Sequence, residues 1–312
     1  MVFRFALRCF LLALPAAAMV VAYAMLYKPY FPAPKVTNNI ALNEKLAFAK
    51  RNMPEGVDVL GLGSSMSLNN LNSKAVMEHF GAVRYLNAGA WGVGAAELSE
   101  VGPLLVDRLK PRIVLLSTNL MDFKRGGHTM VLGEDSSAMA SYMSAHNEAL
   151  SYVLHWDMSY YLRQMEANKV RFTDAANYEF LAFDAHGGAS LNVPPERISR
   201  SRFELPPPIE SELDEDRYAA FAEFARYLHQ HEVQMILMEC AYLDGMRTAE
   251  HNALQAKHLA RLRAVLEPLG HRIVDANQGS WPDALFVDSS HLREKGAEAM
   301  TRFCLAQLNA KP

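Results

Sequence analysis

The stretch VDVLGLGSSMSLNNL, residues 57–71, contains the features on which the fold depends. Its first part, 57–62, is mostly apolar, which is typical of a short strand buried on both faces. The apolar run stops at Gly63-Ser64-Ser65, and a helical pattern follows at 73–80. This order predicts a strand, a tight turn and a helix. Serine is common in turns and at helix N-termini, so the turn alone leaves the role of Ser65 open.

The alternation of strand and helix patterns continues through the chain. Four more apolar runs of strand length follow the first, and amphipathic segments separate most of them. Such alternation predicts a three-layer α/β/α fold around a mainly parallel, five-stranded sheet, similar to the flavodoxin-like arrangement. The predicted strands are 57–62, 83–87, 112–118, 233–240 and 272–275, and the predicted helices are 73–80, 94–109, 217–231, 252–270 and 293–308.

Residues 123–215 form an insertion between the third and fourth strands that the alternation does not require. Aromatic residues and Met are frequent at 139–165, and a loop-like stretch follows at 186–217. We expect a helical hairpin and an ordered loop packed on the sheet. An insertion at strand carboxyl ends can also line the ligand crevice of an open α/β sheet, and the two interpretations are compatible.

The amino terminus carries a membrane-type pattern. Arg4 and Arg8 precede the uninterrupted apolar run CFLLALPAAAMVVAYAMLY at 9–27, close to the ~20 residues that cross a bilayer as a helix. A buried core helix would show a polar stripe, and this run has none. We expect a transmembrane anchor, although Ala22-Tyr23-Ala24 offers the A-x-A pattern of a cleaved signal peptide.

These features give the expected domain organisation. Residues 1–8 are predicted to be a cytoplasmic N-terminus, because the arginines favour an inside position. The anchor at 9–27 is followed by a linker and leading helix at 28–54, of which 28–35 is a proline-containing spacer, and by the main domain at 55–310. That domain would face the periplasm or the cell exterior.

Composition excludes several classes of protein. With 50% hydrophobic residues the chain is typical of a globular protein. Its formal net charge of −3 provides no electrostatic footprint for nucleic acid, so we expect no nucleic-acid partner. The three cysteines lack C-x-x-C spacing and the histidines lack metal-ligand spacing, so no metal or cofactor is predicted. Cys240 and Cys304 either form a disulfide or stay buried free thiols, and we favour the thiols.

Polar or glycine-rich segments follow the carboxyl ends of several predicted strands. Acyl transfer needs a serine held at a sharp strand-to-helix turn, as at Ser65, with N–H groups facing the developing oxyanion. The segment LNAGAWGVG at 86–94 contains glycines that allow close approach of a backbone amide. Asn119 ends the third strand and either donates to the same oxyanion or caps a turn. Singly, each has an ordinary structural explanation.

The fourth segment, FVDSSHLREKG at 286–296, contains Asp288 and His291. A spacing of three residues lets the carboxylate fold against the imidazole and fix its tautomer, as a general base requires. Such pairs also arise by chance, with Asp288 as a helix cap. All four segments lie at strand carboxyl ends of one predicted sheet, in the order serine, glycine, asparagine and Asp-x-x-His.

In this order the chain resembles the SGNH, or GDSL, hydrolase superfamily. The resemblance implies that Ser65 is the nucleophile, that Asp288 and His291 complete the triad, and that Gly92, Asn119 and the Ser65 N–H form the oxyanion hole. Two supporting positions depart from the pattern, because Ser64 replaces Asp in Gly-Asp-Ser, and STNL at 117–120 matches Gly-x-Asn-Asp only at Asn119. The departures put simple esterase activity in more doubt than the triad.

The anchor and the insertion are similar to the membrane-tethered branch of that superfamily, which includes the DltD-like and alginate O-acetylation proteins. The implied function is a serine O-acyltransferase or O-acetylesterase acting on an envelope or exported polysaccharide, beside a membrane-bound acyltransferase. The competing hypothesis is a non-catalytic module of the same fold that binds polysaccharide or holds an acyltransferase complex together.

Overall fold

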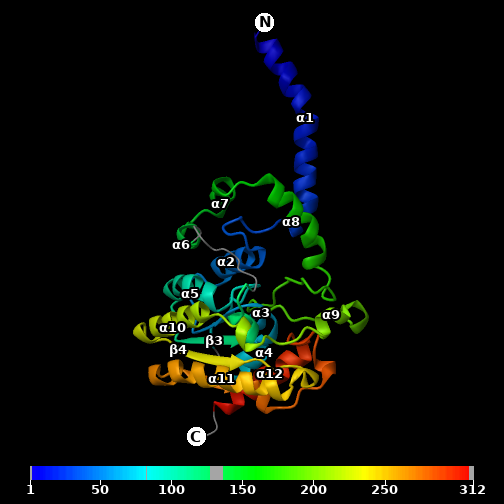
Figure 1. Ribbon diagram of the computed structural model, residues 1–312. Coiled ribbons are helices and arrows are strands. Elements are labelled where there is room, and N and C mark those ends of the chain that lie inside the picture. Colours follow the sequence, from blue (N-terminus) through cyan, green and yellow to red (C-terminus); the bar gives the residue numbers. More distant parts are fainter. Residues whose placement is uncertain (1, 82, 127–135, 309–312) are drawn as a thin grey trace.

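Five parallel strands form the centre of the computed structural model, which describes residues 2–81, 83–126 and 136–308 (Figure 1). The sheet order is β2-β1-β3-β4-β5, and every neighbouring pair is parallel. The predicted α/β fold with five strands is therefore confirmed. The strands are β1 Val59–Leu62, β2 Tyr85–Asn87, β3 Ile113–Thr118, β4 Gln234–Glu239 and β5 Arg272–Asp275.

Both faces of the sheet are buried, because neighbouring side chains on a strand point to opposite faces. On β1, Leu60 and Leu62 join one hydrophobic core, and Val59 joins the other. On β3, Leu116 joins the first of these cores and Leu115 joins the second. This explains why the strands are continuous apolar runs in the sequence.

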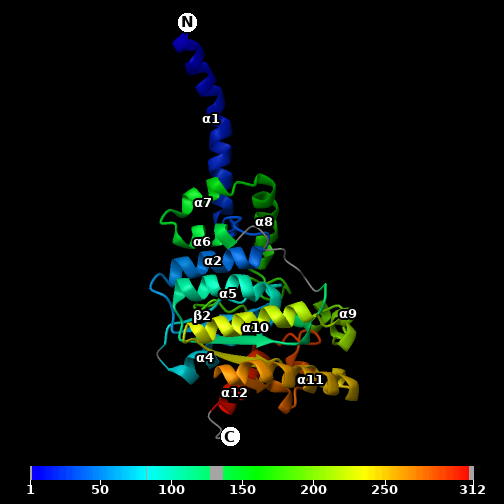
Figure 2. The ribbon, with the colours of Figure 1, turned by 60° about the vertical axis from the view of Figure 1, so that its left-hand side comes forward.

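Helices cover both faces and complete the three layers (Figures 1 and 2). One core packs α2, α5, α10 and α11 against the sheet, and the other packs α4 and α12. Each predicted helix is present, with ends shifted by a few residues. The bounds are α2 Ile40–Asn52, α4 Ser73–Phe80, α5 Ala95–Leu109, α10 Glu215–Gln230, α11 Ala249–Leu266 and α12 Glu294–Gln307.

The order of the strands positions the site. Chain connections run from β1 outward to β2 and then back across to β3, so the topology switches direction between β1 and β3. In open α/β sheets, ligands bind outside the strand carboxyl ends at such a point. A short helix that the sequence did not predict, α3 Ser65–Asn70, begins there immediately after β1.

The insertion is built differently from the predicted hairpin. It contains three consecutive helices, α6 Ser136–Ser144, α7 Glu148–Leu154 and α8 Met158–Arg171. The chain turns between α7 and α8, and the Asp157 side chain starts α8 by accepting a hydrogen bond from Tyr160 N. A loop with the short helix α9 Arg200–Phe203 follows. Residues 127–135 of the insertion lie outside the described residues.

The loop after α8 is held against the carboxyl edge of the sheet. Ala189 N donates to Leu68 O of α3, and Asn87 N at the end of β2 donates to His186 O. The Asn69 amide of α3 donates to Ala189 O. The ordered loop predicted from the sequence is therefore present, and it lies beside the turn that carries Ser65.

The amino-terminal helix α1, Val2–Tyr27, extends away from the rest of the molecule (Figures 1 and 2). Among the residues that the structure describes, no helix combines the length and apolarity needed to cross a bilayer. The anchor predicted at 9–27 falls on α1, and several of its side chains, that of Cys9 included, lie outside the described residues. The anchor remains a prediction.

The predicted spacer at 28–35 packs against the insertion instead of standing free. It includes the short helix η1 Lys28–Tyr30. The Phe31 ring stacks on Tyr161 of α8, with centroids 5.4 Å apart. Ala33 is buried. The three prolines therefore lie in a packed segment.

Candidate active site

The turn after β1 places Ser65 at the start of a helix. Gly63 has φ +123°, a conformation that favours glycine, and a Cβ atom there would lie 2.7 Å from Ser67 Oγ and 2.8 Å from Leu116 Cδ1. The Ser64 hydroxyl accepts a hydrogen bond from Met66 N and caps α3. Ser65 is the first residue of α3, so its N–H has no acceptor within the helix. The turn needs glycine, and it leaves Ser65 half-buried at the sheet edge.

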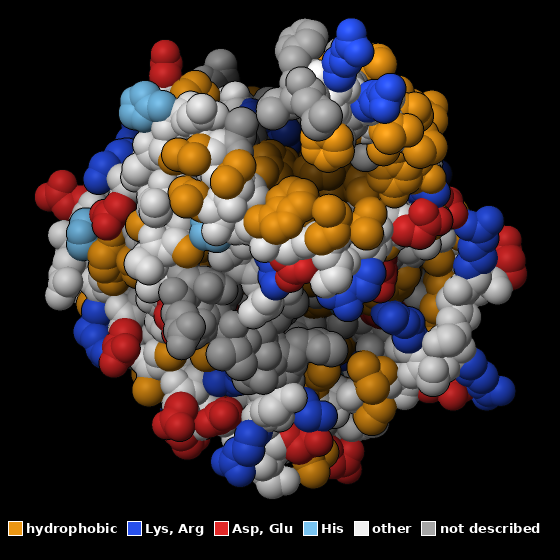
Figure 3. All heavy atoms as spheres, turned by 90° about the horizontal axis from the view of Figure 1, so that it is seen from above, with side chains coloured by type: hydrophobic (Ala, Val, Ile, Leu, Met, Phe, Trp, Pro, Cys, Tyr) orange, Lys and Arg blue, Asp and Glu red, His pale blue; other side chains and the backbone are white. Residues whose placement is uncertain are grey.

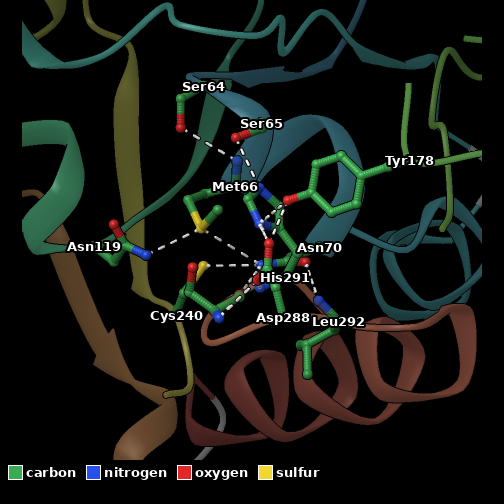
Figure 4. A network of polar contacts seen from close by, with 11 residues as sticks. Ser64, Ser65, Met66, Asn70, Asn119, Tyr178, Cys240, Asp288, His291 and Leu292 are labelled. Carbon is green, nitrogen blue, oxygen red and sulfur yellow. Dashed lines mark hydrogen bonds and ion pairs between the residues drawn. The ribbon is translucent and has the colours of Figure 1, made fainter. Parts of the chain in front are cut away.

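Ser65, His291 and Asp288 form a continuous hydrogen-bonded chain (Figure 4). Ser65 Oγ lies 2.9 Å from His291 Nε2, and His291 Nδ1 lies 2.8 Å from Asp288 Oδ2. A carboxylate only accepts hydrogen bonds, so Nδ1 carries the proton and Nε2 is left to accept from the serine hydroxyl. The structure thus brings together the three residues that the sequence nominated from distant positions.

Local hydrogen bonds fix Asp288 in place. Its Oδ1 atom accepts the N–H groups of Ser290 at 2.9 Å and of His291 at 2.7 Å. Burial alone would raise the pKa of Asp288, but the nearby His291 and the hydrogen bonds from His291, Tyr178 and Ser290 together hold that pKa below its usual value. Asp288 is therefore a carboxylate at neutral pH.

The helix that carries Ser65 also holds the histidine segment. Asn70, at the end of α3, donates from Nδ2 to Ser290 O at 3.1 Å and accepts at Oδ1 from Leu292 N at 2.9 Å (Figure 4). Both contacts are buried. Asn70 therefore binds the chain on either side of His291 from the same short helix that begins with Ser65.

Gly92 and Asn119, which the family resemblance assigned to the oxyanion hole, both line the pocket next to Ser65. Gly92 has φ +70° in the turn after β2. The Asn119 side chain caps the turn after β3 by accepting from Met121 N, and its Nδ2 lies 3.1 Å from Met66 Sδ (Figure 4). Thioether sulfur is a weak acceptor, so this amide can exchange it for a better one. Both alternatives proposed for Asn119, donor and turn cap, are therefore compatible with its position.

A cavity of about 620 Å³ opens at the Ser65 hydroxyl. This size lies within the range of small-molecule binding pockets. Two arginines reach the cavity, and the buried Arg217 pairs with Glu97 of α5 at 3.4 Å. The lining residues outside the hydrogen-bonded chain include Trp91, Met121, Asp122, Tyr178, Glu179, Arg202, Leu205 and Arg217.

A carboxylate lies next to Ser64, where the family pattern has Asp. Asp122 Oδ2 accepts from Ser64 Oγ at 3.0 Å and from Thr118 Oγ1 at 2.8 Å. Burial raises the pKa of Asp122 to about 6, and the hydrogen bonds from Ser64 and Thr118 only partly oppose this. An acidic side chain from the turn after β3 thus lies beside Ser64.

Four residues of the site were missed by the sequence reasoning. Asp122 stands three residues after Asn119, just beyond STNL at 117–120, so an acidic residue close to that segment was visible in the sequence. Asn70, Arg217 and Tyr178 carry no motif, and only the folded chain reveals them. Among the described residues no cluster of His, Cys, Asp and Glu could hold a metal ion. Cys240 and Cys304 are buried free thiols, as favoured from the sequence.

Comparison with known proteins gives a distant likeness. No family model matches the chain, and no curated protein does. A catalytic mutant of an acetylxylan esterase from Geobacillus stearothermophilus is 13% identical with a TM-score of 0.45, covering 83% of this chain and 97% of that one. A carbohydrate acetylesterase from Sinorhizobium meliloti is 9% identical with a TM-score of 0.34, covering 80% and 97%. An acylhydrolase candidate from Bacteroides fragilis is 14% identical with a TM-score of 0.41, covering 83% and 91%.

These three solved structures are thus described as a mutant acetylxylan esterase, a carbohydrate acetylesterase and an acylhydrolase candidate. Identities this low bear on chain architecture alone. The activity has to follow from the geometry of the site.

Proposed function

We propose that this chain is a serine acyl-transfer enzyme of the SGNH type. The single observation that carries the proposal is the hydrogen-bonded chain from Asp288 through His291 to Ser65, ending at an open cavity. A serine hydroxyl within hydrogen-bond reach of an imidazole, itself oriented by a carboxylate, is the arrangement of an activated nucleophile.

The chemistry follows from the atoms at hand. His291 Nε2 takes the proton from Ser65 Oγ as this oxygen attacks an ester carbonyl. The carbonyl oxygen gains a negative charge, which the N–H groups of Ser65 and Gly92 and the Asn119 amide stabilise. His291 then returns the proton to the leaving alcohol, and an acyl group remains on Ser65. A second alcohol or water, deprotonated by His291, removes it.

The second acceptor decides between transfer and hydrolysis. A sugar hydroxyl held better than water makes the enzyme an O-acyltransferase, and free entry of water makes it an O-acetylesterase. The proposed substrate is an acylated envelope or exported polysaccharide, with a membrane-bound acyltransferase as the partner that supplies acyl groups. A cavity with Trp91, Asp122 and two arginines offers both an apolar wall and polar groups for sugar hydroxyls.

Membrane attachment through α1 is part of the same proposal. Large apolar side chains are exposed along α1, among them Phe10, Leu12 and Leu26. Exposed apolar side chains also gather at the base of α1, on α7, α8 and the turn between them (Figure 3). They are Leu150, Val153, Leu154, Trp156, Met158 and Leu162. Apolar surface with an exposed Trp is typical of a membrane interface.

One observation favours the alternative, a non-catalytic binding module. The Asn119 amide contacts Met66 Sδ rather than pointing freely toward Ser65. As a non-catalytic module, the protein would bind polysaccharide in the cavity, or would help to hold an acyltransferase complex together, without turnover.

The test compares the full-length chain with Ser65→Ala and His291→Ala on a chromogenic acetyl ester. Removing either group eliminates the activated nucleophile, so both variants should lose at least about a thousandfold in kcat/KM. Ser99→Ala is the matched control, because the Ser99 hydroxyl bonds within α5 to Ala96 O, outside the cavity.

A serine-directed fluorophosphonate separates the two proposals without a known substrate. Labelling of the wild type that is absent in Ser65→Ala supports catalysis. A folded wild type that stays unlabelled and hydrolyses no ester would instead favour the binding module.

A further inference from the structure

Tyr178 contacts both partners of the Asp288–His291 pair (Figure 4). Its hydroxyl donates to Asp288 Oδ2, and the same hydroxyl oxygen lies 2.9 Å from His291 Nδ1. Oδ2 is also the oxygen that accepts from Nδ1. One carboxylate oxygen therefore serves two donors, and the imidazole N–H is shared between two oxygens.

The tyrosine belongs to the insertion and is held from several sides. The Arg202 guanidinium lies over its ring at 3.8 Å from the centroid, and Arg202 O accepts from Ser289 N. The ring meets the imidazole edge-on, with 5.7 Å between centroids and an interplanar angle of 79°. The ring also packs on a small apolar cluster that includes Leu191 and Val287. The segment around Tyr178 is thus joined to the turn that carries Asp288 and His291.

We propose that Tyr178 is a positioning residue of the acyl-transfer site, so that the insertion supplies a fourth member to the Ser65–His291–Asp288 chain. The inference rests on the proposed function. Tyr178 touches no atom that reacts with the ester, and it acts through the orientation of Asp288 and His291 and through the charge on Oδ2.

Two physical effects follow from this position. The hydroxyl withdraws part of the Oδ2 charge that faces the imidazole, so its removal should strengthen the attraction between Asp288 and a protonated imidazole. The hydroxyl and ring also restrict rotation of the imidazole toward the cavity. Burial, followed by the charge of Asp288, raises the pKa of Tyr178, so the hydroxyl stays a donor throughout the working range.

The groups that face His291 can be identified from each side. Ser65 approaches from α3, Asp288 from its own turn and Tyr178 from the insertion. Arg202 lies beyond the tyrosine ring. Removal of the Tyr178 hydroxyl changes one donor in this set and leaves the ring and its stacking in place.

The test uses Tyr178→Phe in the full-length chain and the rate of fluorophosphonate labelling as a function of pH. We expect the plateau rate to fall about tenfold and the acidic limb of the profile to move upward by roughly half a pH unit. Tyr227→Phe is the matched control, because Tyr227 donates to Asp107 Oδ1 at 2.8 Å far from the cavity. It should change neither the rate nor the profile.

A second variant keeps the test informative if Tyr178→Phe does not fold. Arg202 is exposed, and Arg202→Gln removes the guanidinium from the tyrosine ring without removing a buried side chain. We expect the acidic limb of its labelling profile to move upward in pH as well, by less than in Tyr178→Phe. A purely structural role for Tyr178 would lower the melting temperature and leave the limb unmoved.

A spectroscopic measurement separates failure of this inference from failure of the proposed function. The His291 Nδ1 proton, hydrogen-bonded to Asp288, should give a low-field NMR signal that moves in Tyr178→Phe and not in Tyr227→Phe. The role of Tyr178 would be overturned if the wild type is labelled and Tyr178→Phe shows the same acidic limb and the same NMR signal as the wild type. Wild type that is never labelled would overturn the proposed function, and the role of Tyr178 with it.

Discussion

At the scale of single residues, the carboxyl groups of the site are held in different states by their surroundings. Asp288 is stabilised as a carboxylate by several donors. Asp122 accepts hydrogen bonds from the hydroxyls of Ser64 and Thr118, which favour its ionised form. Burial and the nearby charges of Glu97 and Glu239 oppose its ionisation. Two carboxyl groups at one cavity therefore differ in the pH at which they ionise.

The Asp122 environment predicts a pH-dependent stability. Burial raises its pKa in the folded protein from 3.8 to about 6. The folded state therefore binds its proton more tightly than the unfolded state, and stability falls as pH rises from below 4 to above 6. Asp122→Asn removes this contribution, about 3 kcal/mol at most, so unfolding in urea at pH 4, 5.5 and 7 should give a flatter profile than wild type.

The control for Asp122 is Asp283→Asn, since Asp283 is exposed. This substitution should leave the slope of stability against pH as in wild type. Parallel profiles for wild type and Asp122→Asn would show that Asp122 ionises as an ordinary surface carboxyl does.

At the scale of elements, α3 connects the parts of the site. It begins with Ser65, ends with Asn70 and holds the insertion loop through Asn69. Its six residues are too few to show a helical pattern in the sequence. The partners of Asn70 lie more than two hundred positions away along the chain.

The coupling role of α3 predicts the effect of Asn70→Ala. The change leaves Ser290 O and Leu292 N buried without their partner, which should cost about 2–4 kcal/mol of unfolding free energy. It also loosens His291 relative to Ser65, so fluorophosphonate labelling should slow by about tenfold or more. Urea unfolding and labelling rates measured on the same preparation give both values.

A matched asparagine provides the comparison. Asn52, at the exposed end of α2, donates to Phe48 O of its own helix. Asn52→Ala should change stability by less than about 0.5 kcal/mol and leave labelling unaffected. Wild-type labelling in a destabilised Asn70→Ala would mean that α3 supports the fold without setting the serine–histidine distance.

The difference between what the sequence predicted and what it missed has a physical origin at this scale. Carboxyl ends of parallel strands meet at one edge of a sheet, so the segments that contain Ser65, Gly92 and Asn119 could be placed together from strand patterns, whereas the choice of these residues came from the family resemblance. The course of a long insertion depends on contacts with distant elements. Tyr178 could therefore not be assigned to the site, although its loop was expected near the strand ends.

At the scale of the whole molecule, the proposed membrane attachment predicts a distribution between cell fractions. If α1 anchors the chain, the full-length protein should remain in the membrane fraction after an alkaline carbonate wash. A chain beginning at Lys28 should be released. Protease added to intact cells with a permeable outer layer should digest the domain, because the proposal places it outside the inner membrane.

The contribution of the apolar surface at the base of α1 can be measured separately, by binding to lipid vesicles. In the truncated chain, residual binding to lipid vesicles should decrease when Leu154 and Trp156, which are 68% and 60% exposed, are both changed to Lys. Full-length protein recovered in the soluble fraction would contradict the anchor, and the function of the apolar surface would then have to be sought in a protein partner.

The packing of the segment after α1 determines how the domain is presented. A domain on a free tether samples many orientations and sweeps a broad volume. Here Phe31 stacks on Tyr161, and the Tyr152 hydroxyl donates to Pro32 O, so the segment cannot act as a swivel. These contacts restrict how far the domain can turn relative to α1. If the proposed function and the proposed anchor both hold, a long polymer would be modified at a restricted distance from the membrane.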